Sequence, residues 1–318
     1  MEKIKVGVFG AGHLGKRHIE IIRSLPEYEF LGYYDPAVSL EGVHRFSSEE
    51  ELIAAAEAVV IAAVTTSHYR LGAAAMRSGR HVFMEKPLAG TLEEAKALVK
   101  LSHEARVIGQ VGHVERFNPA FLSVADESLQ PLFIEVHRLA QWNPRGADVS
   151  VVLDLMIHDI DLVLSLVKSP VRSIRASGVA VISDTPDIAN ARIEFMDNCV
   201  ANLTASRFSM KNMRRMRIFQ PNAYLTLDFL ERKSEIYRIS AEPVENAMPF
   251  VFGDKTRYLS VKHPETPKVN AIEEEHKLFA RSVRSGVQPE VNFASAYDSL
   301  VVAHQVLEHI PHAEPVLA

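Results

Sequence analysis

One apolar segment, residues 152–167, carries side chains suited to acid–base chemistry. Its hydrophobic residues predict a largely buried helix, yet Asp154, His158 and Asp161 recur at i, i+4 and i+7 and therefore share one face. A polar stripe on a buried helix indicates either a reactive site or a core histidine that its acidic neighbours satisfy. Asp159 lies beside the stripe and could instead pair locally.

A lysine stands where a predicted strand ends. Residues 82–84 form a short apolar run, and Glu85-Lys86-Pro87 follows directly. Ligands of parallel α/β sheets bind at the carboxyl edge of the strands, so Lys86 is well placed to contact one. The alternative is a solvated surface lysine. Pro87 fixes its own φ angle and permits a cis Lys86–Pro87 bond.

A glycine-rich loop opens the chain. Gly10-Ala11-Gly12-His13-Leu14-Gly15 gives G-x-G-x-x-G directly after an apolar run and at the start of a helical pattern. The first glycine permits a tight turn, the second lets a pyrophosphate approach the backbone, and the third lets helix and strand pack closely. The phosphates would then meet the N–H groups of a helix N-terminus. The alternative is a loop whose glycines only make a turn.

An acidic residue follows this loop at a characteristic distance. Asp35 lies 20 residues after Gly15 and ends the second predicted strand. From that position a carboxylate accepts hydrogen bonds from the adenine ribose hydroxyls. Asp35 therefore favours NAD as the cofactor, with NADP as the alternative.

A parallel sheet is needed to position these residues. From residue 4 to residue 111, short apolar runs alternate with helical patterns, which predicts parallel strands joined by helices. The runs are nearly continuous in hydrophobicity, as strands covered on both faces require. Ser48 before three glutamates, and Thr91 with Glu94, are typical of helix starts. The predicted strands are 4–9, 30–34, 58–64, 82–84 and 107–111.

The pattern changes after residue 112. Longer strand-like segments separated by turn residues predict a mainly antiparallel sheet, and helical patterns at 271–285 and 294–309 end the chain. Residues 240–268 are rich in proline and predict an irregular loop over a cleft or at an oligomer contact. The expected strands are 133–142, 174–182, 189–195, 200–206, 217–219, 224–228 and 235–239.

Composition limits the classes of function. The 318 residues are 47% hydrophobic and 24% charged, which predicts a globular protein of two domains, residues 1–115 and 116–318. A formal charge of −5 without a long basic run argues against nucleic acid as a partner. The apolar stretches are far shorter than the ~18 residues of a membrane span, so no membrane partner is expected.

Cysteine and histidine usage bears on the location of the protein and on metal binding. A single cysteine, Cys199, and an N-terminus without an export signal lead us to expect a cytoplasmic protein. The 14 histidines form no H-E-x-x-H pattern, and one cysteine cannot build a thiolate cage, so we expect no metal.

The ordered combination of G-A-G-H-L-G, Asp35, Glu85-Lys86-Pro87 and D-x-x-x-H-D-I-D resembles the glucose-fructose oxidoreductase and inositol dehydrogenase (Gfo/Idh/MocA) family over nearly the whole chain. The resemblance implies an α/β protein: an N-terminal Rossmann domain with a doubly wound parallel sheet, then a domain with an open, mainly antiparallel sheet. It also implies NAD-dependent oxidation of a sugar secondary hydroxyl to a ketone by a homodimer or homotetramer. The alternative from another class is a non-catalytic NAD(H)-binding sensor.

By this resemblance Lys86, Asp154 and His158 are the catalytic residues. His158 would remove the hydroxyl proton, since the intrinsic pKa of histidine is near 6.5, and Asp154 would orient it or a substrate hydroxyl. Lys86 would stabilise charge that develops on oxygen and contact the nicotinamide ribose. Asp161 would support His158 or have a local structural role, and His68 would either contact the cofactor or only begin a helix. The implied cofactor-binding residues are Gly10, Gly12, His13, Leu14, Gly15, Asp35, Thr65, Thr66, His68, Glu85 and Lys86.

The predicted domain junction suggests a substrate. Residues 112–119, G-H-V-E-R-F-N-P, resemble family members that oxidise nucleotide sugars, especially UDP-N-acetylglucosamine 3-dehydrogenases. The expected substrate is therefore a small sugar or nucleotide sugar. The first candidate is UDP-N-acetylglucosamine, oxidised at its C3 hydroxyl, and the alternative is a cyclitol or free sugar. Arg116, Asn118 and Arg207 are the candidates to bind it. Pairing of Arg116 with Glu115, or a helix cap from Asn118, would explain those residues equally well.

Overall fold

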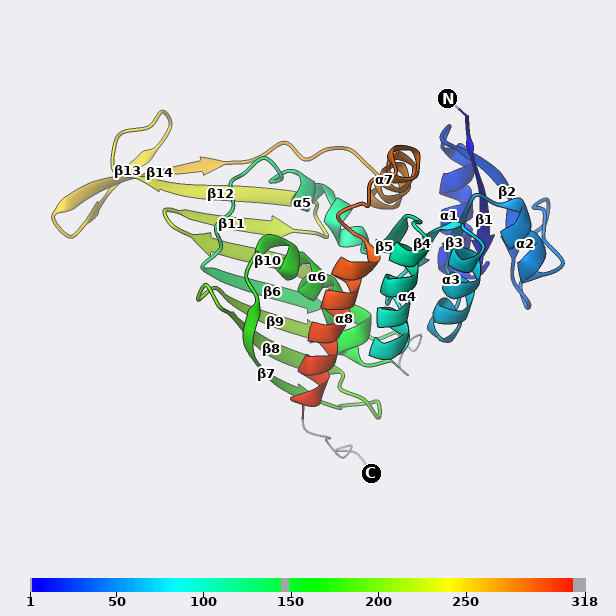
Figure 1. Ribbon diagram of the computed structural model, residues 1–318. Coiled ribbons are helices and arrows are strands. Elements are labelled where there is room, and N and C mark those ends of the chain that lie inside the picture. Colours follow the sequence, from blue (N-terminus) through cyan, green and yellow to red (C-terminus); the bar gives the residue numbers. More distant parts are fainter. Residues whose placement is uncertain (1, 144–148, 311–318) are drawn as a thin grey trace. The chain divides into compact units, whose positions relative to one another are not determined.

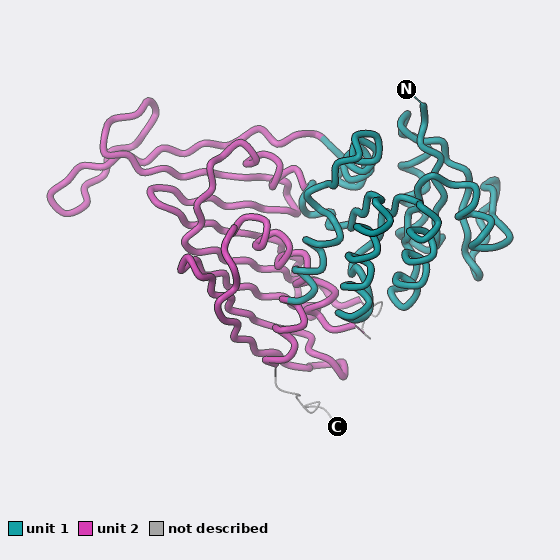
Figure 2. Tube along the Cα trace, viewed as in Figure 1, with its two compact units in different colours: residues 1–117, 269–301 teal, residues 118–268, 302–318 magenta. Residues whose placement is uncertain are grey.

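The computed structural model describes residues 2–143 and 149–310, and it divides the chain into two compact units (Figures 1 and 2). Unit 1 contains residues 1–117 and 269–301, and unit 2 contains residues 118–268 and 302–318. The boundary between the units after residue 117 lies close to the expected boundary after residue 115. Residues 269–301 were expected in the second domain, but they belong to unit 1 because they complete its core.

Unit 1 is built on a five-stranded parallel sheet in the order β2-β1-β3-β4-β5. The chain leaves β1 in one direction for β2 and then returns to the other side of β1 for β3. This reversal is a topological switch point, beside which ligands of such sheets bind. The strands are β1 (Ile4–Phe9), β2 (Tyr28–Tyr34), β3 (Ala58–Ile61), β4 (His81–Glu85) and β5 (Gly109–Gly112).

The helices of unit 1 begin where the sequence predicted. The Ser48 hydroxyl accepts a hydrogen bond from the Glu51 N–H at 3.2 Å, and the Thr91 hydroxyl accepts one from the Glu94 N–H at 3.2 Å. The helical elements are α1 (His13–Ser24), α2 (Glu49–Ala55), η1 (Thr65–Ser67), α3 (His68–Arg77), α4 (Leu92–Glu104), η2 (Val114–Phe117) and α7 (Ala271–Ser285), followed by α8 (Phe293–Glu308), whose first half belongs to this unit.

Helix α7 supplies part of the core of unit 1. Phe279 and Ala280 are fully buried in one cluster with Val6, Val8 and Phe83 of the sheet. The Phe279 ring packs edge-to-face on Phe83, with centroids 5.9 Å apart. Sequence periodicity marks α7 as amphipathic but does not say which sheet its apolar face covers.

Unit 2 is built on a nine-stranded sheet in the order β13-β14-β12-β11-β10-β6-β9-β8-β7, in which the β6–β9 pair is parallel and the other pairs are antiparallel. Helices α5 (Pro119–Leu122) and α6 (Ile157–Leu166) pack on its strands. The predicted fold class is thus confirmed. The strands are β6 (Phe133–Leu139), β7 (Val171–Val179), β8 (Ile188–Phe195), β9 (Val200–Ser206), β10 (Met213–Gln220), β11 (Ala223–Asp228), β12 (Lys233–Ser240), β13 (Met248–Phe252) and β14 (Lys255–Lys262).

Residues 240–268 differ from the expected irregular loop. They contain β13 and β14, a hairpin that projects from one end of the sheet in Figure 1. Pro249 made a strand hard to predict here, but β13 is an edge strand, where a residue without an N–H is tolerated. Gly253, with φ of +63°, supplies the turn between the strands.

Shortening Phe279 tests whether α7 belongs to the core of unit 1. Phe279→Ala should lower the free energy of unfolding by about 3–5 kcal/mol, because it removes a fully buried ring and leaves a cavity. Urea denaturation followed by circular dichroism measures this loss. Phe252→Ala is the control, because Phe252 is 74% exposed and its removal should change stability by less than about 0.5 kcal/mol. Equal losses for both variants would contradict this role of α7.

Candidate active site

The three glycines of the loop after β1 have different surroundings. A methyl group on Gly10, whose φ is +91°, would lie 2.5 Å from the Ala62 carbonyl oxygen, and one on Gly15 would lie 2.1 Å from the Gly10 carbonyl oxygen. A methyl group on Gly12 would meet no described atom within 4 Å. The chain itself therefore requires the first and third glycines, whereas the second opens outward, as a backbone cradle for a pyrophosphate requires. His13 and Leu14 are exposed beside it.

Asp35 directly follows β2 next to this loop, and its carboxylate is held by backbone groups. Oδ2 accepts from the Ala11 N–H at 2.7 Å, and Oδ1 accepts from the N–H groups of Ala37 and Val38 at 2.8 Å. Partial burial raises the pKa of Asp35, but these hydrogen bonds and the charge of Arg45 outweigh that effect, so the net pKa is lowered. The carboxylate is therefore ionised at neutral pH. It retains acceptor capacity for a ribose hydroxyl, since a carboxylate offers about four acceptor positions.

Arg45 is a neighbour of Asp35 that the sequence did not indicate. Its Nη2 donates to the main-chain carbonyls of Asp35 at 2.6 Å and Pro36 at 3.2 Å. The signal was weak, because Arg45 comes ten residues after Asp35 rather than directly after it. Arg45 thus brings a positive charge beside the carboxylate at the end of β2.

The E-K-P turn (residues 85–87) follows β4, and the Lys86–Pro87 peptide bond is cis. Lys86 is half-buried, whereas Glu85 is buried. The start of α3 lies against this turn through His68, whose Nδ1 is 2.8 Å from the Pro87 carbonyl oxygen and whose Nε2 is 3.1 Å from the Ala63 carbonyl oxygen. The His68 ring is therefore turned into the protein.

Thr65 and Thr66 lie just before this histidine, in the short helix η1 that follows β3. Thr65 is half-buried and Thr66 is exposed. Both stand at the carboxyl edge of the sheet, as the sequence predicted from the end of a strand. Val64, 71% exposed, adds an apolar surface to the same edge.

Two buried histidines form a chain that ends on Glu85, and sequence reasoning missed both. His18 Nε2 lies 2.8 Å from Glu85 Oε1, and His18 Nδ1 lies 2.8 Å from His276 Nε2. His18 falls on the inward face of α1, three residues after Gly15, and that placement of a polar residue on a buried face was the available signal. His276 comes from α7, so only the fold brings it here.

In unit 2, Asp154 and His158 are half-buried on successive turns of one helical segment. The segment is not uniform: η3 (Val152–Met156) is a π-helix, and α6 continues from Ile157. Short π-helical segments occur frequently at functional sites. A spacing of four residues is close to one turn in either helix type, so the two side chains share a face, as predicted.

Two other aspartates of this segment are buried. Asp159 forms a two-pronged ion pair with Arg138 of β6, through Nε to Oδ2 at 2.8 Å and Nη2 to Oδ1 at 2.7 Å. This pair anchors α6 on the sheet, so Asp159 has a structural role, but its partner comes from a separate strand and not from its local neighbours. Asp161 is 1% exposed, one turn beyond His158.

The three candidate substrate-binding residues have structural contacts. Arg116 is half-buried in η2 of unit 1. Asn118 accepts from the Ala120 N–H at 3.1 Å and so caps α5, while its amide donates to the Phe229 carbonyl at 3.1 Å. Arg207 is 6% exposed and donates to the main-chain carbonyls of Val149 and Pro186. The structure thus gives Asn118 and Arg207 roles within unit 2.

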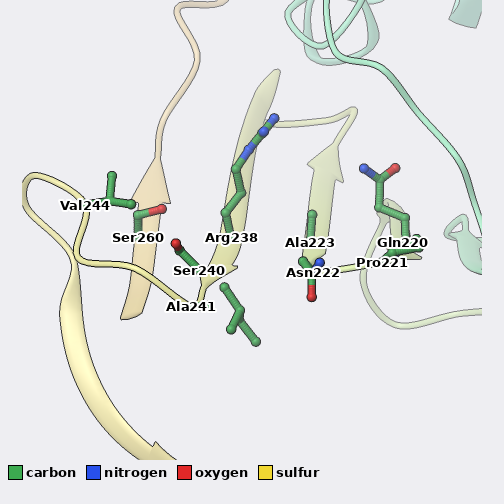
Figure 3. A pocket seen from close by; sticks show the side chains of 10 residues that line it. Gln220, Pro221, Asn222, Ala223, Arg238, Ser240, Ala241, Val244 and Ser260 are labelled. Carbon is green, nitrogen blue, oxygen red and sulfur yellow. The ribbon is translucent and has the colours of Figure 1, made fainter. Parts of the chain in front are cut away.

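A hollow of 430 Å³ lies elsewhere in unit 2, between the β10–β11 turn and the loop after β12 (Figure 3). Asn222, Ser240 and Ser260 contribute to its lining, together with Arg238, which is paired with Glu127. None of the sequence-predicted site residues lines it.

Of the helices that the structure describes, none is long and apolar enough to cross a membrane. Residues 2–143 and 149–310 also contain no group of three side chains able to hold a metal ion.

The contrast between Gly12 and Gly15 gives a direct test of the loop. Gly12→Ala should leave the free energy of unfolding unchanged but raise the Kd for NADH at least tenfold, because its methyl group would occupy the space of the bound dinucleotide. Gly15→Ala should destabilise the protein itself, since its methyl group meets backbone. Fluorescence titration and urea denaturation separate the two effects. Unaltered NADH binding by Gly12→Ala would exclude this loop as the cradle.

Comparisons with known proteins agree with this geometry. Residues 4–113 match the model of the oxidoreductase family with an NAD-binding Rossmann fold, and residues 101–225 match the GFO/IDH/MocA C-terminal domain. UDP-N-acetylglucosamine 3-dehydrogenase from Acidithiobacillus ferrooxidans is 35% identical over 252 residues, which cover 77% of this chain and 80% of that protein. A solved structure of that enzyme aligns with a TM-score of 0.88 at 30% identity and covers 98% of both chains.

A second relative widens the range of substrates in the family. The scyllo-inositol 2-dehydrogenase (NAD(+)) of Bacillus subtilis is 28% identical over 235 residues, which cover 65% of this chain and 68% of that protein. The fold, the glycine loop and these relatives lead to one conclusion: the chain belongs to the Gfo/Idh/MocA family of NAD-binding oxidoreductases and is an enzyme.

Proposed function

We propose that this enzyme oxidises the C3 hydroxyl of UDP-N-acetylglucosamine to a ketone with NAD as the acceptor. The observation that carries the proposal is the similarity to the Acidithiobacillus ferrooxidans enzyme, which extends over 98% of both chains in the structural alignment. A cyclitol is the second candidate substrate, favoured by the similarity to scyllo-inositol 2-dehydrogenase.

Three residues carry the chemistry in this proposal. His158 takes the proton of the sugar hydroxyl while hydride leaves the same carbon, since an imidazole is well suited to act as a base near neutral pH. Asp154, one turn earlier on the same segment, orients His158 or a neighbouring sugar hydroxyl. Lys86, at the carboxyl edge of the Rossmann sheet, stabilises the negative charge that develops on oxygen.

The residues around the glycine loop fit an NAD molecule. Bound NAD supplies the hydride acceptor. Gly12 leaves room for its pyrophosphate, and the ionised Asp35 accepts from the adenine ribose. Because a negative carboxylate repels a 2′-phosphate, Asp35 supports NAD over NADP, although Arg45 places a compensating positive charge nearby.

Initial-rate measurements test this function. Purified enzyme with NAD and UDP-N-acetylglucosamine should form NADH and a keto sugar, faster than with NADP or with myo-inositol. His158→Ala should lower kcat by about 100-fold or more, whereas His103→Ala, a change of an exposed histidine on α4, should not alter it. Turnover of inositol alone would select the second candidate. NADH binding without turnover of any sugar would instead indicate a sensor.

The open face of the unit 2 sheet supports a homo-oligomer, either a dimer or a tetramer. An aromatic ladder crosses it, with ring centroids 6.0 Å apart for Phe133–Phe219, 4.8 Å for Phe219–Tyr224 and 5.4 Å for Tyr224–Tyr237. The Arg217–Glu135 ion pair lies on the same face, so this face offers both signs of charge to a second copy of itself. Val251 and Phe252, which point to opposite faces of the projecting hairpin, are both exposed and add apolar surface beside the sheet.

A charge placed in this aromatic ladder tests the assembly. Tyr224→Glu should reduce the solution mass measured by sedimentation equilibrium, because it would bury an unpaired carboxylate between subunits. Phe208→Glu changes an exposed apolar residue outside the ladder and should leave the mass unchanged. A wild-type protein that sediments as a monomer would contradict the proposed assembly.

A further inference from the structure

The Glu85 carboxylate is buried beside the lysine on which the proposed function depends. Glu85 is 9% exposed, and its Oε2 lies 3.3 Å from the Lys86 N–H. Gly112 at the end of β5 leaves room for this carboxylate, since a methyl group there would lie 2.6 Å from Glu85 Oε1. A buried carboxylate of this kind needs hydrogen-bond donors on the protein side.

His276 and His18 form a hydrogen-bonded chain that ends on this carboxylate. His276 is fully buried, and its Nδ1 makes no hydrogen bond to any residue that the structure describes. Burial holds the pKa of His276 well below its ordinary value. His276 is therefore neutral, and we assign its single proton to Nε2, where a partner lies 2.8 Å away.

This assignment fixes the direction of the chain. The His276 Nε2–H donates to His18 Nδ1, which must then be unprotonated, so that His18 carries its proton on Nε2 and donates it to Glu85 Oε1. The Phe83 ring packs on both imidazoles, with centroids 4.9 Å from His276 and 5.5 Å from His18, so the chain lies in apolar surroundings. Hydrogen bonds there are stronger and more directional than in water.

The other side of the turn has a similar support. His68 is 1% exposed, and its Nδ1 lies 2.8 Å from the Pro87 carbonyl oxygen. Burial lowers the pKa of His68, while hydrogen bonds to Pro87 and Ala63 offset part of that effect. Lys86 thus stands between two residues that are each tied to a buried histidine.

We propose that His18 and His276 are positioning residues for Lys86, because they hold the Glu85 carboxylate, and with it the E-K-P turn, in one orientation. This inference rests on the proposed catalytic role of Lys86. It also gives α7 a part in the reaction, since His276 reaches from the far end of the sequence to the turn that presents the lysine. Glu85 then acts from within the protein rather than as a direct contact to the cofactor.

A pair of substitutions at His276 separates positioning from packing. His276→Leu should lower kcat about 10- to 100-fold while the KM for the sugar and the Kd for NADH change less than about twofold, because a small displacement of a catalytic group has effects of that size. His276→Gln, whose amide can still donate to His18, should recover most of the loss. A packing role predicts the reverse order, since leucine suits apolar surroundings better than glutamine.

A second readout does not depend on the substrate. Acetylation of Lys86 by N-hydroxysuccinimidyl acetate, measured by peptide mass spectrometry against the exposed Lys100, should change at least threefold in His276→Leu. The matched control is His81→Leu. It removes a histidine at the other end of β4, where Nδ1 accepts from the Ile108 N–H, and should change neither readout. If the wild type turns over no sugar, the proposed function fails, and the acetylation rates still test the positioning.

A substitution outside the two histidines tests the proposal even if His276→Leu fails to fold. Gly112→Ala places a methyl group against Glu85 Oε1 and should produce the same loss of kcat and the same altered acetylation of Lys86. Unchanged kcat and unchanged Lys86 acetylation in either folded variant would overturn the proposal. A glutamine variant no more active than the leucine variant would also overturn it.

Discussion

The close approach of helix α1 to the strands at Gly10 and Gly15 determines the geometry of the Rossmann edge. At both positions a methyl group would collide with main-chain carbonyl groups, so the backbone itself sets how near the helix comes to β1 and β3. That proximity lets the Ala11 N–H reach Asp35, just beyond the end of the neighbouring strand β2. It also turns the inward face of α1, with His18, toward the end of β4. The dinucleotide loop and the lysine turn are therefore parts of one packed unit.

The charges at this edge are arranged by the backbone as much as by side chains. Three N–H groups stabilise the Asp35 carboxylate, while Glu85 is stabilised from inside the protein by His18. The two carboxylates therefore differ in access: Asp35 keeps acceptor capacity toward a ligand, and Glu85 is turned inward. In the proposed function Asp35 supports selection of the cofactor, and in the proposed positioning role Glu85 supports placement of Lys86.

The sequence predicted the elements better than the contacts between distant segments. Short-range patterns sufficed for the glycine loop, for the caps at Ser48 and Thr91, and for the shared face of Asp154 and His158, because these depend on neighbours in the chain. The β13–β14 hairpin was missed because Pro249 argues against a strand unless that strand is known to lie at the edge of a sheet. Arg45 and His276 were missed because nothing near them in the sequence indicates that Asp35 or His18 will be their partner.

The helical segment of unit 2 shows which features a motif predicts and which depend on distant residues. The D-x-x-x-H spacing holds because four residues approximate one turn in both the π-helix η3 and the helix α6. The same spacing does not indicate which of the neighbouring acids faces the sheet. Asp159 does so because it pairs with Arg138, which lies 21 residues away in the sequence, on β6. Because that buried pair fixes the rotation of α6, it also determines which way Asp154 and His158 are presented. A structural ion pair thus sets the orientation of the proposed catalytic face.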